Sequence, residues 1–208
     1  MKKILFIAML TVLAPLSFAS DTLLELQHKW AVANYEAKGD MQVAQFERLI
    51  AIADKAVEQA PKDASLWTWN GIIKSTFAGV KGGLGALGYA KAAKKSFEQA
   101  IAIDGSVLDG SAYTSLGVLY YNVPGWPIGF GDKKKAEKLL KKALVINPDG
   151  IDSNYFYADY FVVKKDYKNA QIFFLKAQKA APRASRPLAD KGRQQEISEA
   201  LTALKSLM

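Results

Sequence analysis

The sequence predicts an all-α protein, a solenoid of antiparallel helix pairs with about four repeats and a C-terminal capping helix. Three observations predict this fold class. Half of the 208 residues are apolar, which is enough to build a core. Four similar segments carry apolar residues three and four positions apart, the spacing of one helix face. These segments close with proline or glycine at positions 61, 105, 148 and 182, and the last step of 34 residues matches the period of paired-helix repeats.

The first residues predict an export signal. Lys2 and Lys3 precede an apolar run from Ile4 to Leu16, and Ser17-Phe18-Ala19 is a small-x-small cleavage pattern. We expect cleavage after Ala19, a signal peptide at residues 1–19 and a mature protein in the periplasm. The alternative is an uncleaved anchor, although the run is shorter than the roughly 20 residues that span a bilayer. We expect no stable membrane span after cleavage.

The rest of the chain predicts one repeat array and one closing helix. We expect the array at residues 20–185, with repeats at about 22–61, 62–105, 106–148 and 149–182. Residues 186–208 form the expected capping helix, because the end of such an array needs a polar outer face. Pro187 suits the first turn of that helix, and Ile197, Leu201 and Leu204 share one of its faces.

Small and large residues follow one order in the last three segments. In the last segment these residues are Ala158, Phe161, Ala170, Phe174, Ala177 and Pro182. In the third segment they are Tyr113, Leu116, Gly117, Tyr120, Ala136, Leu140, Ala143 and Pro148. In the second segment they are Trp67, Gly71, Ala93, Phe97 and Ala100. This order resembles the tetratricopeptide repeat (TPR) family over roughly residues 22–182, with a degenerate first copy. The small residues let paired helices approach, and the large ones fill the space beside them. The resemblance implies a concave surface that binds ligands or partners.

Two segments carry insertions between their paired small residues. Ala158 and Ala170 are twelve positions apart, whereas Gly71 and Ala93 are 22 apart and Gly117 and Ala136 are 19 apart. Both insertions should emerge at the same edge of the array. The first contains GxGxxG at positions 83–88, but a dinucleotide site needs a preceding strand, and the sequence before it is helical. A hinge or an extension of the helix is the favoured interpretation.

The second insertion predicts a shaped loop with aromatic side chains. Pro124, Pro127 and three glycines restrict or permit particular turns, and the loop carries Trp126 and Phe130. These rings either fold back as a lid on the array's own core or line a ligand cavity or partner surface. Both interpretations stay open at this stage.

The face pattern of the resembled family selects further candidates on the concave side. Together with the loop, the predicted partner- or ligand-binding residues are Ile72, Thr114, Val118, Tyr121, Asn122, Trp126, Phe130, Asp152, Tyr155 and Asp159. Asp152 and Asp159 are seven positions apart and so share a helix face. Polar recognition is favoured over catalysis, because a carboxylate pair needs closer convergence to act on a substrate.

The sequence predicts no catalytic residues, no metal site and no cofactor. The chain has no cysteine and one histidine, His28, which excludes disulfides, an acylated cysteine anchor and multi-histidine metal sites. No nucleophile, base and acid form a recognisable set, so we expect that the protein is not an enzyme. Arg183, Arg186, Asp190 and Arg193 form a charged cluster, which either pairs internally or binds an acidic partner.

The leading functional hypothesis is a non-catalytic periplasmic scaffold that binds an exported protein through the concave face and the Trp126/Phe130 loop. The alternative is a carrier or accessory protein for a hydrophobic small molecule. An exported helical-repeat chain is similar to the tetratricopeptide (T) component associated with tripartite ATP-independent periplasmic (TRAP) transporters, and this weaker resemblance implies a substrate-binding partner. The formal charge of +8 suits a lysine-rich solvated surface or an acidic partner, and we expect no nucleic-acid partner for an exported protein.

Overall fold

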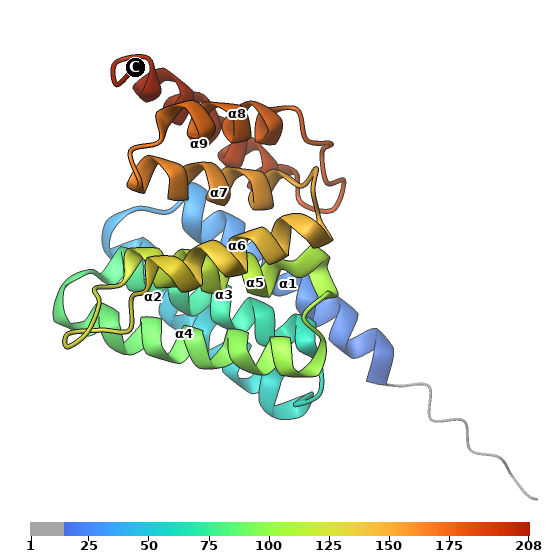
Figure 1. Ribbon diagram of the computed structural model, residues 1–208. Helices are drawn as coiled ribbons and strands as arrows, with labels where there is room; N and C mark the ends of the chain where they lie inside the picture. The colour runs from blue at the N-terminus through green and yellow to red at the C-terminus, as the bar shows by residue number, and fades with distance from the viewer. Residues whose placement is uncertain (1–14) are drawn as a thin grey trace, which may run out of the picture.

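The computed structural model describes residues 15–208 and, except for Leu84, the side chains from Ser20 onward, so the predicted signal peptide lies mostly outside the described residues. The described chain is helical throughout and has no strand (Figure 1). Its helices are α1 (Pro15–Tyr35), α2 (Gly39–Gln59), α3 (Ala64–Lys81), α4 (Gly83–Asp104), α5 (Val107–Asn122), α6 (Lys133–Ile146), α7 (Ile151–Val163), α8 (Tyr167–Gln178) and α9 (Pro187–Leu204). The predicted all-α fold class is confirmed.

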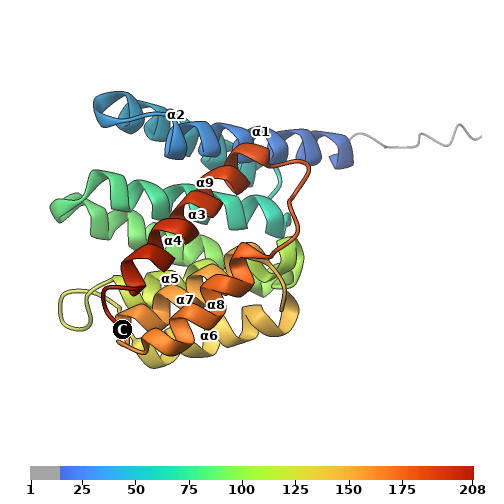
Figure 2. The ribbon, with the colours of Figure 1, turned by 90° about the horizontal axis from the view of Figure 1, so that it is seen from above.

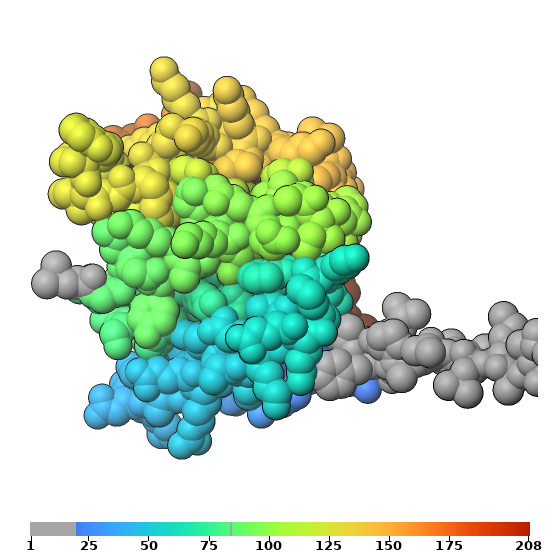
Figure 3. Space-filling view, turned by 90° about the horizontal axis from the view of Figure 1, so that it is seen from below, coloured from blue at the N-terminus to red at the C-terminus, as the bar shows by residue number. Residues whose placement is uncertain are grey.

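Consecutive helices pack as antiparallel pairs, most closely α3 with α4, α5 with α6 and α7 with α8. Figure 3 shows that successive parts of the chain form successive layers of this stack. Aspartates at the N-caps of α3, α6 and α8 define where these helices begin. Asp63 accepts hydrogen bonds from the amides of Ser65 and Leu66, and Asp132 from those of Lys134 and Lys135, which satisfies amides that a helix start leaves unpaired.

Small residues form notches where paired helices approach. A Cβ placed at Gly117 of α5 would lie 2.8 Å from Cγ of Leu140 and 3.3 Å from the carbonyl oxygen of Ala136, both on α6. A Cβ at Gly71 of α3 would lie 2.5 Å from the ring of Phe97 on α4. Leu140 and Phe97 are fully buried, so each large side chain occupies the space that the missing Cβ leaves.

The first insertion lengthens two helices instead of forming a loop. α3 runs to Lys81, α4 starts at Gly83, and Gly82 alone separates them. Gly82 and Gly83 have φ values of 59° and 60°, a left-handed backbone that glycine adopts without steric cost. The GxGxxG segment thus forms the first turns of α4 and follows a helix. The strand that a dinucleotide site requires does not precede it in the described chain.

The second insertion is the loop between α5 and α6, residues 123–132, which lies on the same side of the molecule as the α3–α4 turn (Figures 1 and 2). Two backbone hydrogen bonds close its base. The amide of Asp132 donates to the carbonyl of Tyr120 (2.8 Å), and the amide of Gly131 donates to the carbonyl of Pro124 (2.9 Å). Within the loop, the Gly129 amide donates to Gly125 (3.0 Å). The loop is therefore shaped by its own hydrogen bonds.

The C-terminal helix joins the two ends of the array. α9 packs on α8, as expected of a capping helix, but it also packs on α1 and touches α7. Figure 2 shows it running obliquely from α1 toward the last helices. Ala189 belongs to the buried cluster of Trp30 and Trp69, whereas Ile197 and Leu204 belong to the cluster of Phe174. The segment predicted as a cap at one end thus also closes the concave side of the array.

The start of α5 departs from regular helix. Leu108, Asp109 and Gly110 have left-handed φ values of 50°, 57° and 72°, so the uninterrupted part of the helix begins at Ser111. Among the described residues, no helix has the length and apolarity needed to cross a membrane.

Candidate functional site

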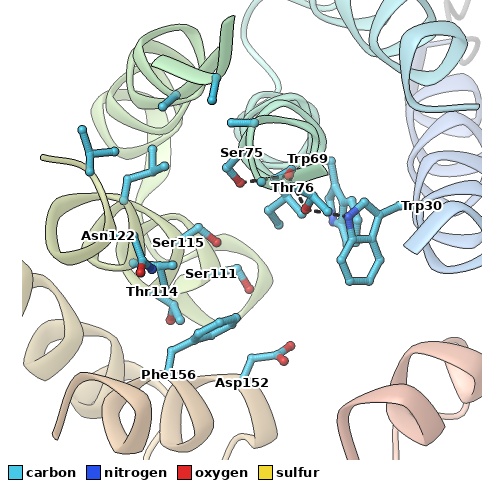
Figure 4. A pocket seen from close by; sticks show the side chains of 18 of the residues that line it. Trp30, Trp69, Ser75, Thr76, Ser111, Thr114, Ser115, Asn122, Asp152 and Phe156 are labelled. Carbon is cyan, nitrogen blue, oxygen red and sulfur yellow. Dashed lines mark hydrogen bonds between the residues drawn. The ribbon is translucent and has the colours of Figure 1, made fainter. Parts of the chain in front are cut away.

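The concave side of the array holds a cavity of about 650 Å³, within the range of small-molecule sites. The first helix of every pair contributes to its wall, and the rest comes from α4, the α5–α6 loop, the segment between α8 and α9, and α9 itself. Figure 4 shows Trp30 and Trp69 on one side of this space and Thr114, Ser115, Phe156 and Asp152 on the other. Side chains of α9, of the segment before it and of both insertions thus complete the lining of the cavity.

One wall of the cavity is apolar. It is made by α3, α4, α5 and the loop, through Ile72, Ala78, Ala86, Leu87, Ala90, Val118, Leu119 and Ile128. Both insertions take part, since Ala86 and Leu87 belong to the first and Ile128 to the second. Such a surface favours the aliphatic or aromatic body of a ligand, because its burial removes apolar area from water.

Hydroxyl groups are set into the wall on α3 and α5. Ser75, Thr76, Ser111, Thr114 and Ser115 all line the cavity. Thr76 is engaged, because its Oγ1 accepts a hydrogen bond from Nε1 of Trp30 (2.9 Å) and donates to the Ile72 carbonyl (2.9 Å). Ser111 donates to the carbonyl of Leu108 (2.5 Å). These side chains supply polar positions within an otherwise apolar surface.

A network of arginines and carboxylates forms the opposite wall. Arg183 Nη1 lies 2.6 Å from Oδ2 of Asp152, and its Nη2 lies 2.6 Å from Oδ1 of Asp190. Arg193 Nε lies 2.9 Å from Oδ1 of Asp152, and Arg193 also pairs with Glu196. The network ties α7 to α9 and to the segment before it, which explains in physical terms why the C-terminal helix crosses the concave side.

The charge of Asp152 stays fixed near neutral pH. Burial opposes ionisation of Asp152, but the guanidinium groups of Arg193, Arg183 and Arg186 outweigh it and hold the pKa of this carboxyl well below its usual value. Burial raises the pKa of Tyr35 and that of Tyr155 to about 12. Groups so far from neutrality are poor general acids or bases. The arginine and carboxylate wall is therefore suited to binding a charged group of a ligand.

A second cavity of about 550 Å³ adjoins the first. Both cavities share a polar wall, made of Trp69, Ser111, Thr114, Asp152, Arg183 and Arg186. The apolar residues of the two insertions line the first cavity alone, whereas Asn147, Asp149 and Gly150 line the second alone. The shared polar wall therefore lies between an apolar space and a more polar one.

The structure brings half of the predicted binding residues to the cavity. Ile72, Thr114, Val118, Asn122 and Asp152 line it. Tyr121, Tyr155 and Asp159 are not among its lining residues. Tyr121 is buried and donates a hydrogen bond to Oδ2 of Asp159 (2.6 Å). The guanidinium carbon of Arg193 lies over the ring of Tyr155, 4.2 Å from the centre of that ring. These three side chains hold α5, α7 and α9 together, and a face pattern from sequence misses this because it does not place α9.

The two loop aromatics behave differently. Trp126 is 90% exposed and projects from the loop tip. Phe130 is half-buried and packs edge-on against Tyr120, with ring centres 5.6 Å apart, while the ammonium of Lys94 lies 5.8 Å from its ring. Phe130 thus matches the interpretation as a lid on the array's own core. Trp126 matches the interpretation as part of a partner surface. Neither lines the cavity, to which the loop contributes Val123, Pro124 and Ile128 instead.

Several cavity residues escaped the sequence-based prediction. Trp30 and Tyr35 lie in the degenerate first repeat, and Trp69 lies in the second; all three line the cavity. Arg183, Arg186 and Arg193 were recognised as a charged cluster but not as part of the concave face. The sequence signal that could have placed them there is the occurrence of three arginines within eleven residues, because a solvated helix surface does not require such a cluster.

Comparison with known proteins supports the fold alone. No family model and no curated protein matches the sequence. The structure is similar to that of TTC0263, a thermophilic TPR protein of Thermus thermophilus, with a TM-score of 0.58 and 15% sequence identity over 88% of this chain and 99% of that one. A weaker similarity, to the MamA protein, has a TM-score of 0.48 and 14% identity over 92% of each chain. The fold is TPR-like, and at this identity the comparison carries no functional argument.

Proposed function

We propose that this chain is a non-catalytic binding protein that holds a small molecule with an apolar body in its concave cavity. The observation that carries the proposal is a cavity of about 650 Å³ that α9, the segment before it and both insertions line together with the first helix of each pair. An extended protein surface is the usual use of an open repeat array, but here the C-terminal helix lies across the concave side. A cavity of this volume fits a small molecule. The proposal thus takes up the alternative of the two sequence-based hypotheses, and a protein partner is kept below as a second candidate.

The chemistry of the wall also supports binding without catalysis. The carboxylate of Asp152 is paired with two arginines, so it is not free to move a proton. Export to the periplasm, predicted from residues 1–19, is part of the proposal, because it places the ligand outside the cytoplasm. The link to TRAP-type transport stays a prediction about the pathway in which such a carrier would act.

The proposal is tested by filling the cavity. Titration calorimetry with 1-decanol, a neutral probe with an aliphatic body, should show saturable binding to the unaltered protein. Val118→Trp places an indole in the apolar wall and should weaken binding at least about tenfold, or 1.4 kcal/mol. Val145→Trp is the matched control, because Val145 is 77% exposed and does not line the cavity. Equal affinities for the two variants, or no binding by the unaltered protein, would contradict the proposal.

A protein partner is a second candidate function, favoured by the exposure of the loop tip. Trp126 and Ile128 are 90% and 69% exposed, and large apolar side chains grouped on a surface are typical of interaction sites. Lys133, Lys134 and Lys135 follow at the start of α6 and are exposed, so the partner would present an acidic rim. Quantitative affinity capture from a periplasmic extract, with unaltered protein and Trp126→Ala compared, tests this candidate. A partner retained equally by both would exclude the loop tip as its binding site.

A further inference from the structure

The arginines of the cavity wall are not equivalent. Arg183 and Arg193 share the nearby carboxylates, those of Asp152, Asp190 and Glu196. Arg186 has no carboxylate oxygen within 4.0 Å among the side chains that the structure describes. Its Nε is buried and has no hydrogen-bond partner there. Leaving a buried donor without a partner is costly. The Arg186 side chain as a whole is only half-buried, so its guanidinium can reach a partner in the cavity.

The surroundings of Arg186 hold its charge in place without a direct ion pair. The guanidinium carbon lies 4.9 Å from the centre of the Trp69 ring, a stacking arrangement that restricts the orientation of the planar group. Burial, and then the positive charge of Arg183, lower the pKa of Arg186. The group remains a cation at neutral pH because an arginine titrates far above it. The carboxylates of Asp152 and Asp190 act against burial and the charge of Arg183 from beyond ion-pair distance. The site is therefore a positioned positive charge with no directly paired carboxylate.

Arg186 lies where the two cavities meet. It lines both of them, together with Trp69, Ser111 and Thr114. The first cavity continues from this shared wall to the apolar residues of α4 and the loop, including Leu87 and Ile128. A ligand that reaches from one region to the other would present an anionic group at Arg186 and an aliphatic body to the apolar wall.

We propose that Arg186 binds the anionic head group of an amphiphilic ligand whose aliphatic body occupies the cavity. The inference rests on the proposed function and names the chemical class of its ligand: an oxyanion, carboxylate or phosphate, on an aliphatic chain. A guanidinium with free N–H groups matches the geometry of either oxyanion. The hydroxyl of Thr114, on the same shared wall, is available to the remaining oxygen of such a head group.

The test compares three probes with the same chain length: decanoate, decyl phosphate and 1-decanol. The unaltered protein should bind at least one of the two anions about tenfold or more tighter than the alcohol, the scale of one charged hydrogen bond. Arg186→Gln should remove this preference while leaving the affinity for 1-decanol within about threefold, since a factor of three is under 1 kcal/mol. Lys191→Gln removes a charge from an exposed position of the same helix and should leave all three affinities unchanged. The anion that binds more tightly identifies the head group.

Two further measurements separate recognition from a structural role. Arg186→Lys keeps the charge but loses the planar fork, so it should retain part of the preference for the anion. Without ligand, Arg186→Gln should leave the melting temperature nearly unchanged, because Arg186 is only half-buried and makes no direct ion pair. A lower melting temperature together with equal losses for the anions and the alcohol would overturn the inference and leave the carrier proposal intact. Anion binding without any alcohol binding would overturn the proposed site for an apolar body, and with it the inference, because the aliphatic chain would not occupy the cavity. Binding of none of the probes would likewise overturn both.

Discussion

Gly192 of α9 lies directly against the ring of Tyr35 of α1, so closely that a Cβ at this position would collide with the ring. The two residues are far apart in sequence and connect the last helix to the first. The contact closes the concave side of the array, because it draws the N-terminal half of α9 onto α1 while Ile197 and Leu204 stay buried with Phe174. Gly192 therefore leaves the space that the ring of Tyr35 needs, and this contact helps to place α9 across the concave side.

Replacing Gly192 by leucine should release α9 from α1. The added side chain cannot fit against Tyr35, and overpacking of this kind costs about 1–3 kcal/mol. Urea denaturation should show that loss, and hydrogen exchange should show faster exchange in the N-terminal half of α9. Lys191→Leu is the control, because Lys191 is exposed on the same helix. Unchanged exchange in the Gly192 variant would mean that the contact with Tyr35 does not hold the helix.

The notch at Gly117 should be intolerant of even one methyl group. Gly117→Ala brings a Cβ to 2.8 Å from Cγ of the fully buried Leu140, and we expect a loss of about 1–3 kcal/mol. Gly88→Ala makes the same change in α4, where nothing lies within 4 Å of the added Cβ, and should stabilise the protein by about 0.5–1 kcal/mol. Chemical denaturation measures the change in the free energy of unfolding, and opposite signs of this change in the two variants would support the packing of Gly117 against Leu140. A stabilised Gly117 variant would refute it.

Stability should fall in acid partly because of Asp152. Its pKa is held well below the usual value in the folded protein by arginines, against the effect of burial, and it returns to about 3.9 in the unfolded chain. A depressed folded pKa gives stability that is present above the unfolded pKa and lost as the pH falls through the folded one. The contribution is therefore complete near pH 6 and decreases progressively below about pH 4.

Asp152→Asn isolates this contribution. The variant should lose about 3 kcal/mol at pH 7, because Arg183 and Arg193 each lose a charged partner. Its stability should then depend less on pH than that of the unaltered protein between about pH 5 and 3, since the titrating carboxyl is gone. Urea denaturation at each pH measures both. If the two proteins lost stability in parallel with acid, the ion pairs of Asp152 would not be responsible for the dependence.

The two aromatic residues of the loop should differ in their effect on stability. Trp126→Ala should change the free energy of unfolding by less than about 0.5 kcal/mol, because the ring is 90% exposed. Phe130→Ala should cost about 1–2 kcal/mol, because it removes an edge-to-face contact with Tyr120 and partly buried area. Thermal or chemical denaturation of the two variants checks this. Equal losses would show that Trp126 also packs on the array.

The helix pairs follow from the sequence, because their signals are local. The three- and four-residue spacing, the notches at Gly117 and Ala158 and the N-cap aspartates act within one helix or between neighbours in the chain. It also placed the insertions and singled out the arginine cluster. The tertiary structure alone decided what these parts do together. The position of α9 depends on contacts of Gly192 with Tyr35 and of Arg193 with Asp152, which join residues distant in the sequence, and no periodic pattern reports such contacts. Whether Arg186 has a counter-ion is likewise a property of the folded arrangement, because it depends on which carboxylates the other two arginines have already engaged.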